Sequence, residues 1–184
     1  MIKSSHLYID AQNFMCEVSK VLFRAYKKED AKEILSWIKN EREFRLWSAD
    51  RYDSYPATPN DINKNYSKSK EISNFNPMTL EDEGKVIGHL ILRNPGNDKE
   101  IIRLGFIIVD NSIRGKGYGK ILINAAIKYA RETLGAKEIN LGVFLNNEGA
   151  LHCYESVGFK IIKIEKNAYQ FYDEQWDCAE MILK

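Results

Sequence analysis

The fold is decided by one stretch of the chain, Val109-Asp110-Asn111-Ser112-Ile113-Arg114-Gly115-Lys116-Gly117-Tyr118-Gly119-Lys120. Before it, residues 104–109 form a short run rich in β-branched and aromatic residues, which is typical of a strand buried on both faces. After it, apolar residues recur at helical spacing on one face, at Ile121, Leu122, Ala125, Ala126 and Tyr129. The glycines therefore lie where a strand turns into a helix.

These glycines are arranged as a phosphate-binding loop requires. Gly115, Gly117 and Gly119 lack a Cβ, so backbone N–H groups can converge on one point and a ligand can approach the main chain. The helix that follows adds unpaired N–H groups and a partial positive charge. Full positive charges come from Arg114, Lys116 and Lys120. The combination predicts a pyrophosphate site, and a basic turn without a ligand is the alternative.

The spacing separates three nucleotide-binding motifs. A P-loop places Ser or Thr after Gly-Lys, and none follows here in that register; the dinucleotide motif Gly-x-Gly-x-x-Gly does not match glycines spaced by two. Segment 114–119 instead resembles the coenzyme A loop of the GNAT superfamily of acyl-CoA N-acyltransferases. That loop runs Gln or Arg, any two residues, Gly, any residue, then Gly or Ala.

A second motif strengthens the resemblance. GNAT proteins follow the next strand with Asn-x-x-Ala, then Tyr four residues later, then Gly-Phe. The chain matches this register with Asn147, Ala150, Tyr154, Gly158 and Phe159. The match covers about residues 78–166, and residues 21–47 resemble the family's first strand and helix more loosely. We expect a single GNAT-like domain over 21–184, preceded by an N-terminal extension or arm over 1–20.

Composition narrows the class of protein. The 184 residues, 44% of them hydrophobic, suit one domain, and a formal charge of +1 gives no sign of a nucleic-acid or membrane partner. No apolar run reaches the roughly 20 residues of a membrane span, and the start lacks the apolar segment of a signal peptide, so we expect a cytoplasmic protein. Three scattered cysteines and three unclustered histidines suggest neither a disulfide framework nor a metal site.

Local patterns predict most elements. Strands are expected at 21–26, 78–80, 86–92, 104–109, 138–144, 159–164 and 170–183, with Leu7–Ile9 as a strand or arm. Helices are expected from an opening at residues 28–30 to about Ile38, after Thr58, over 117–134 and over 148–156. Thr58 and Asp61 predict a capping box for the second of these, which should be short. Strand, glycine loop, helix and strand make a right-handed βαβ unit, whose ligand should sit at the carboxyl end of the first strand.

The resemblance implies the rest of the fold and the cofactor. It implies an α/β fold with a mixed, twisted sheet of about seven strands, splayed between its central parallel strands to admit acetyl-CoA as cosubstrate. The strand Ile107, Ile108 and Val109 would pair with the pantetheine, and an N–H near its end would polarise the thioester carbonyl. The pyrophosphate would be held by Arg114, Gly115, Lys116, Gly117, Tyr118, Gly119 and Lys120. Asn147 would contact the cofactor and Tyr154 would lie near the sulfur.

The chemistry requires few side chains. A thioester is already activated, so an amine can attack it directly, and Tyr154 fits the acid that protonates the departing thiolate. Packing alone is the alternative role for Tyr154. Cys153 points about 100° away from Tyr154 on a helix, and we interpret it as a structural thiol. For the base, the sequence offers only His89, Glu100 and Asp110 as candidates, or a water chain.

The acceptor is the least defined part. The aromatic residues Trp37, Phe44 and Trp47 form either core or the wall of an acceptor pocket. We predict transfer of an acetyl group to a primary amine, of a small molecule or a protein N-terminus, with Trp47 and Tyr172 on the acceptor side. A noncatalytic acyl-CoA-binding or sensing module is the alternative, and a nucleotide-phosphate enzyme lacks its motif. We expect a monomer or homodimer with no metal.

Overall fold

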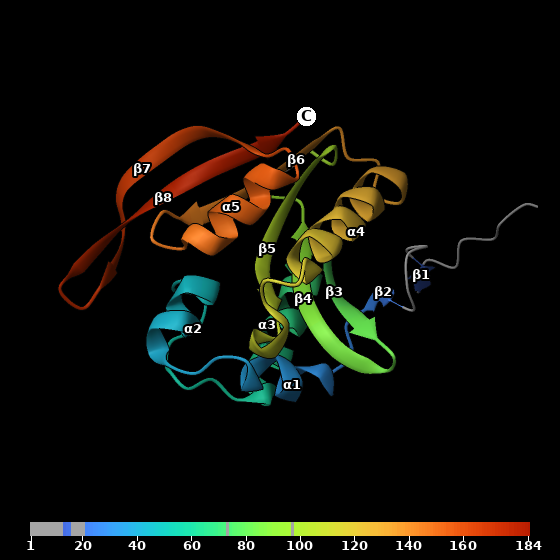
Figure 1. Cartoon of the computed structure of the whole chain (residues 1–184), viewed down its shortest axis with the longest axis horizontal. Coiled ribbons are helices and arrows are strands. Elements are labelled where there is room, and N and C mark those ends of the chain that lie inside the picture. The colour runs from blue at the N-terminus through green and yellow to red at the C-terminus, as the bar shows by residue number, and fades with distance from the viewer. Residues whose placement is uncertain (1–12, 16–20, 73, 97) are drawn as a thin grey trace, which may run out of the picture.

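The computed structural model describes residues 13–15, 21–72, 74–96 and 98–184, which form one mixed sheet flanked by helices (Figure 1). The strand order is β1-β2-β3-β4-β5-β6-β8-β7. The strands are β1 (Asn13–Met15), β2 (Val21–Ala25), β3 (Phe75–Asp82), β4 (Lys85–Arg93), β5 (Ile101–Val109), β6 (Glu138–Phe144), β7 (Lys160–Phe171) and β8 (Glu174–Leu183). The helices are α1 (Asp30–Ser36), α2 (Glu41–Ser48), α3 (Pro59–Ile72), the 3-10 turn η1 (Asn111–Ile113), α4 (Tyr118–Glu132) and α5 (Glu148–Ser156).

The predicted sheet of about seven strands corresponds to β2–β8, with β5 and β6 as its parallel pair. The eighth strand, β1, pairs antiparallel with β2 and belongs to the segment predicted as an N-terminal arm. The strand or arm predicted at Leu7–Ile9 lies outside the described residues.

Helices cover the two faces of the sheet separately. Figure 1 shows α4 and α5 together on the face turned toward the viewer, where they cover the strands of the main core. Strand β4 shows the alternation that this layering requires. Leu90 and Leu92 join the core under α4, whereas Ile91 packs on the other face with residues from α1, α2 and α3. The sheet is therefore buried on both sides along its centre.

Two sequence-based predictions were wrong in extent. The helix after Thr58 was expected to be short, but α3 runs for 14 residues. The closing strand predicted over 170–183 is broken, because the chain turns at Tyr172, where φ is +51°, and β8 begins at Glu174. Residues 170–171 therefore end β7, which pairs with β8 as a long antiparallel hairpin.

The capping box that begins α3 is confirmed. The N–H of Thr58 donates to Asp61 Oδ2 at 2.8 Å, and the N–H of Asp61 donates to Thr58 Oγ1 at 3.3 Å. These bonds satisfy donors that would otherwise be unpaired at the start of the helix.

None of the helices in the described part of the chain is long and apolar enough to cross a membrane.

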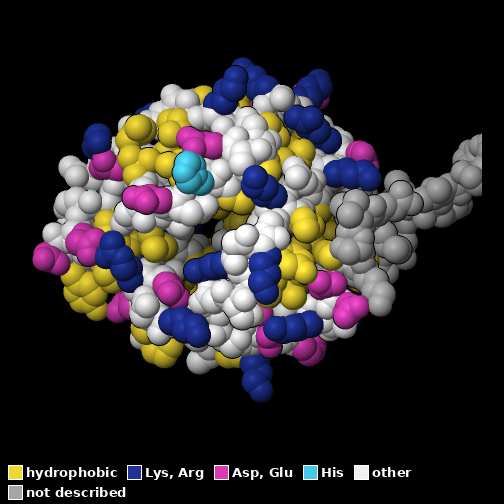
Figure 2. Space-filling view, in the orientation of Figure 1, with side chains coloured by type: hydrophobic (Ala, Val, Ile, Leu, Met, Phe, Trp, Pro, Cys, Tyr) yellow, Lys and Arg dark blue, Asp and Glu magenta, His cyan; other side chains and the backbone are white. Residues whose placement is uncertain are grey.

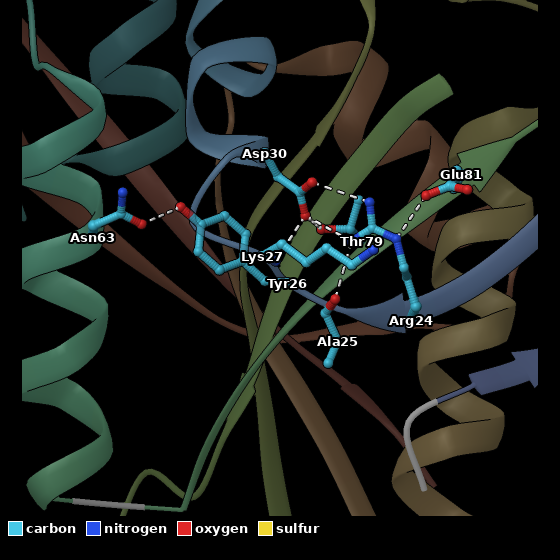
Figure 3. A network of polar contacts seen from close by, with 8 residues as sticks. All are labelled: Arg24, Ala25, Tyr26, Lys27, Asp30, Asn63, Thr79 and Glu81. Atoms are coloured by element: carbon cyan, nitrogen blue, oxygen red, sulfur yellow. Dashed lines mark hydrogen bonds and ion pairs between the residues drawn. The ribbon is translucent and has the colours of Figure 1, made fainter. Parts of the chain in front are cut away.

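A buried ion-pair network joins β2, α1 and β3 (Figure 3). Arg24 donates to both carboxylate oxygens of Asp30, at 2.8 and 3.0 Å, and to Glu81 at 2.7 Å. The side chains of Arg24 and Asp30 are only 7% and 5% exposed. Burial alone would raise the pKa of Asp30, but hydrogen bonds from Arg24, the Lys27 N–H and Thr79 outweigh it and lower the pKa.

We expect Asp30→Asn to lower the free energy of unfolding by about 3 kcal/mol, because it removes one partner of a buried charge. For a chain of this length, the melting temperature should fall by roughly 6–12 °C. The pKa of Asp30 is lowered by folding, so its contribution is present above the unfolded pKa and is lost as the pH falls. Denaturant unfolding should therefore show less acid sensitivity in the variant.

The exposed carboxylate of Asp53 supplies the control. Asp53→Asn makes the same change outside the network and should alter the stability by less than about 0.5 kcal/mol. Equal stabilities for the two variants would show that the network does not hold α1 on the sheet.

Candidate active site

The glycine loop has the backbone geometry of an anion site. Gly115 and Gly117 have φ values of +78° and +88°, and a Cβ added at either would meet nothing within 4 Å. The first hydrogen bond within α4 runs from the Ile121 N–H to the Gly117 carbonyl at 3.2 Å. The N–H groups of residues 118–120 therefore have no acceptor inside the helix. Open space, free donors and the helix dipole fit a pyrophosphate.

Positive charge surrounds this end of α4. Figure 2 shows Lys and Arg side chains gathered around the middle of the viewed face, where α4 begins. Arg114, Lys116 and Lys120 are exposed, and none of them forms an ion pair with another described residue. These side chains are free to meet a phosphate. The loop before them is fixed by Asp110, which accepts from the Ser112 N–H at 2.9 Å and from Lys85 Nζ at 2.9 Å.

Tyr118 and Gly119 of the loop make packing contacts within the protein, whereas the sequence-based expectation was that they hold the pyrophosphate. The hydroxyl of Tyr118 donates to Asp82 at 2.9 Å, so this side chain anchors α4 to β3. A Cβ at Gly119 would lie 3.2 Å from Cys153 Sγ, so this glycine permits the close packing of α4 on α5. Burial raises the pKa of the Cys153 thiol, as expected of a structural cysteine.

The two parallel strands pair only at their beginnings. Ile101, Ile102 and Arg103 of β5 pair with Glu138, Ile139 and Asn140 of β6. Residues 104–109 and 141–144, all of them described, have no partner in the other strand. Ile108 and Val109 are paired with β4 on their other edge. The edge of β5 that faces β6 is therefore open along the residues predicted to bind pantetheine.

Strand β5 also carries a bulge that the sequence did not reveal. His89 and Ile91 of β4 are two positions apart, but their partners Ile108 and Gly105 are three apart. The extra residue is accommodated around Phe106, whose φ is +50°. Such a conformation is strained for a bulky residue and marks a functional site more often than chance. The bulge redirects backbone groups just where the strands diverge.

A cavity of about 770 Å³ passes through this opening. On the side of α2 and α3 it is lined by the chain around Trp47 and by residues of α3. Its middle is lined by both splayed strands, at residues 103–107 and 142–144, and its far end reaches Asn147 and Tyr154 of the α5 segment. One cavity thus joins the two faces of the sheet.

Tyr154 is buried at the far end of the cavity. It is 6% exposed and packs edge-on against Phe159, with ring centroids 6.3 Å apart. Burial raises the pKa of its phenol above the usual value, so the hydroxyl stays protonated near neutral pH. Asn147, at the N-terminus of α5, makes no side-chain capping bond, so its amide remains available to the cavity.

The two predicted acceptor-side residues lie in different places. Trp47 lines the cavity, stacks on Tyr52 with centroids 6.1 Å apart, and lies 5.2 Å from the Phe106 ring. Tyr172 is 74% exposed and lines a separate hollow of about 430 Å³, where its hydroxyl donates to Glu41 at 2.8 Å. The two hollows share Asp50 and Tyr169 on their walls. Trp37 and Phe44, the other aromatics, are buried in the core.

None of the three candidate bases from the sequence lines the cavity. His89 is fully buried against Tyr66, whose hydroxyl lies 2.7 Å from its Nε2, and burial lowers its pKa to about 3. Glu100 lies at the start of β5 and pairs with Lys137, and Asp110 fixes the loop. The carboxylates that do line the cavity are Asp50 and Glu165. Only the folded arrangement of α2 and β7 brings them there.

The described residues contain no group of three or more His, Cys, Asp and Glu side chains that could hold a metal ion.

Comparison with known proteins agrees with this geometry. A model described as the acetyltransferase (GNAT) family matches residues 32–159. Spermidine N(1)-acetyltransferase of Vibrio cholerae is 26% identical over 149 residues, which are 77% of this chain and 79% of that protein. An uncharacterised N-acetyltransferase of Methanocaldococcus jannaschii is 37% identical over 68 residues, which are 37% of this chain and 30% of that protein.

The fold has a similar solved structure. Spermidine N-acetyltransferase from Vibrio cholerae, crystallised in complex with CoA and spermine, gives a TM-score of 0.75 at 23% identity. The superposition covers 89% of this chain and 95% of that one. At this identity the likeness concerns the fold alone.

Proposed function

The chain belongs to the acetyltransferase (GNAT) family, and we propose that it transfers an acetyl group from acetyl-CoA to a primary amine by direct attack on the thioester. The observation that carries the proposal is the cavity between β5 and β6, which has the open strand edge and the Phe106 bulge on one wall and Tyr154 at its end. Residues 21–184 would form one acetyltransferase domain, with residues 1–20 as an arm.

Acetyl-CoA supplies an already activated acetyl group, so no nucleophile of the protein is needed. The chain has to bind the cosubstrate, orient the amine and stabilise the oxyanion. We assign cofactor binding to the open edge of β5 at Ile107, Ile108 and Val109. The backbone N–H groups at the bulge are the donors for the developing oxyanion, because they are fixed in the strand before any ligand arrives.

We assign pyrophosphate binding to the loop from Arg114 to Lys120. The free N–H groups at the start of α4 and the unpaired basic side chains support this assignment. Tyr118 would contribute its backbone N–H, since its hydroxyl is bonded to Asp82. Asn147 would contact the cofactor from the opposite wall.

Tyr154 is assigned the role of general acid. A phenol that remains protonated near neutral pH can give its proton to the departing thiolate. The amine must lose a proton to a group on the acceptor side. Asp50 and Glu165 line the cavity there and are placed to accept this proton directly or through water.

Acetyl-CoA consumption over a panel of amines tests the proposal. CoA thiol release should depend on both acetyl-CoA and an amine. The panel should include polyamines, because the Vibrio cholerae relative is a spermidine N-acetyltransferase. It should also include amino acids and peptides with a free N-terminus, because the proposal does not specify which primary amine is the acceptor. Tight acetyl-CoA binding without amine-dependent release would refute catalysis and favour a noncatalytic acyl-CoA-binding module.

Trp47 should control acceptor selectivity. Trp47→Ala removes the ring that packs beside Phe106 on the acceptor side, so the acceptor KM should change by roughly tenfold or more, with the acetyl-CoA KM little affected. Tyr172→Ala alters the adjoining hollow and should have a smaller effect, because Tyr172 is mostly exposed. Steady-state kinetics with each substrate varied measures both.

A rise in the KM for acetyl-CoA in Trp47→Ala would assign Trp47 to the cofactor side. A loss of folding, seen as a fall in melting temperature, would assign the ring to the core.

A further inference from the structure

Three arginines meet on the acceptor side of the cavity. Arg93 of β4 and Arg103 of β5 are direct partners across the antiparallel pair, so their side chains leave the same face of the sheet. Arg51 enters from the chain that follows α2, and all three line the cavity. Like charges placed directly opposite each other destabilise a sheet unless something compensates them.

The three differ in their partners. Arg103 is compensated by Glu180, with two bonds of 2.7 and 2.8 Å, and also donates to Asn140. Arg51 lies 3.9 Å from Asp50 at an exposed position. Arg93 forms no hydrogen bond or ion pair with any residue that the structure describes, although it is half-buried. Among the residues that the structure describes, the Arg93 guanidinium therefore has no anionic partner.

The surroundings of Arg93 make its positive charge unfavourable. Burial lowers the pKa of Arg93, and the nearby charges of Arg103 and Arg51 lower it further. An unpaired charge withdrawn from water is costly unless a partner arrives. A guanidinium presents a planar fork of donors that matches a carboxylate or phosphate group. A bound anion would satisfy Arg93 and relieve its repulsion with Arg103.

The cluster lines the same cavity as the bulge at Phe106, where the reaction is proposed to take place. Arg103 precedes Phe106 by three residues, so it is roughly 10 Å from the bulge along the strand. The pyrophosphate loop follows the opposite end of β5, beyond Val109. An anion at Arg93 is thus within reach of a small molecule whose amine lies at the bulge, and it is distant from the loop assigned to the cofactor.

We propose that the acceptor is an amine that also carries an anionic group, a carboxylate or phosphate, and that Arg93 binds this group with Arg51 and Arg103. This inference rests on the proposed acetyl transfer and names its substrate class. The acidic residue Glu165 lines the same cavity from β7, on the other side of β5 and β6 in the sheet order. Asp50 also lines the cavity, beside Arg51. Three arginines thus face two carboxylates in the lining, which suits an acceptor with both charges better than a polyamine.

Matched acceptors test the proposal with the full chain and acetyl-CoA. Diglycine is compared with its C-terminal amide, phosphoethanolamine with ethanolamine, and spermidine serves as the purely cationic acceptor. The wild type should favour the anionic member of at least one pair by about tenfold or more in kcat/KM, the effect of one charge-assisted hydrogen bond. The two pairs distinguish a carboxylate from a phosphate.

The variants identify the residue. Arg93→Gln should abolish most of this preference through the KM for the anionic acceptor, and Arg93→Lys should retain part of it. Arg131→Gln makes the same change at an exposed residue in the last turn of α4 and should keep the preference. Melting temperatures confirm that each variant folds. If Arg93→Gln does not fold, Arg93→Lys is compared with the wild type instead.

Three results would overturn the inference while leaving acetyl transfer intact. The first is a wild type that prefers the neutral or purely cationic acceptors. The second is a preference for the anionic acceptor that survives in Arg93→Gln. The third is an Arg93→Gln variant in which only the KM for acetyl-CoA is raised, which would assign Arg93 to the cofactor. If no amine stimulates CoA release at all, the proposed function is refuted, and the inference falls with it.

Discussion

Replacing Tyr154 by Phe is expected to lower kcat about 100-fold while acetyl-CoA still binds, because the variant loses the proposed general acid and keeps the packing. The ring is buried and contacts Phe159, and Phe preserves this contact. The thiolate would then have to leave without a proton. Steady-state kcat and acetyl-CoA affinity, measured together, separate the chemical role from a structural one.

Tyr129→Phe is the matched control for this experiment. Tyr129 is also buried in the core, on α4, and does not line the cavity. Its loss of a hydroxyl should leave kcat within about twofold of the wild type, because surface and core changes away from the site leave chemistry intact. If Tyr154→Phe behaves like this control, Tyr154 is a packing residue and the acid must be another group.

The second large effect concerns the glycine loop. Acetyl-CoA at about 100 times its dissociation constant should stabilise the wild type by about 2.7 kcal/mol, which corresponds to a melting shift of roughly 5–10 °C. Gly117→Asp should abolish the shift. It places a Cβ and a negative charge in the open space beside the free N–H groups, where the pyrophosphate is expected.

Two variants separate charge from backbone strain. Gly117→Asn introduces a side chain of the same size at the same φ of +88° without the charge, so it should retain part of the shift. Gly135→Asp adds the charge at another open glycine with positive φ, past the far end of α4, and should retain all of it. An unchanged shift in Gly117→Asp would move the pyrophosphate away from this loop.

The central part of the fold was predictable from the sequence because its signals are local. The apolar run of β5, the glycines before α4 and the helical spacing after them each depend on neighbouring residues. The bounds of β6 and α5 agree with the predicted 138–144 and 148–156. The capping box of α3 was likewise readable from Thr58 and Asp61, but nothing local indicated how far that helix continues.

The remaining features of the candidate site could not be predicted from the sequence, because they depend on pairing between strands that are distant along the chain. The bulge at Phe106 arises from the register between β4 and β5, and an aromatic residue gives no signal for a positive φ. The same register brings Arg93 beside Arg103. Glu165 reaches the cavity only through the β7–β8 hairpin, whose turn the sequence-based prediction missed.

Gly119 shows how a correct motif can have a different physical cause. The spacing suggested that all three glycines open the backbone to phosphate. The first two have positive φ and open surroundings, whereas Gly119 lies against Cys153 of α5. We therefore expect this position to tolerate a small residue only if the Cys153 side chain or α5 gives by a few tenths of an ångström, whether or not a cofactor is bound.

The proposed reaction can be observed directly by following the transfer of label from isotope-labelled acetyl-CoA to an amine. The full chain is incubated with labelled acetyl-CoA and the best acceptor of the panel, and the products are identified by mass spectrometry. We expect a labelled N-acetyl amine formed in equal amount to free CoA, with little product from Tyr154→Phe. Acetyl-CoA that binds but leaves every amine unlabelled would contradict the proposed reaction.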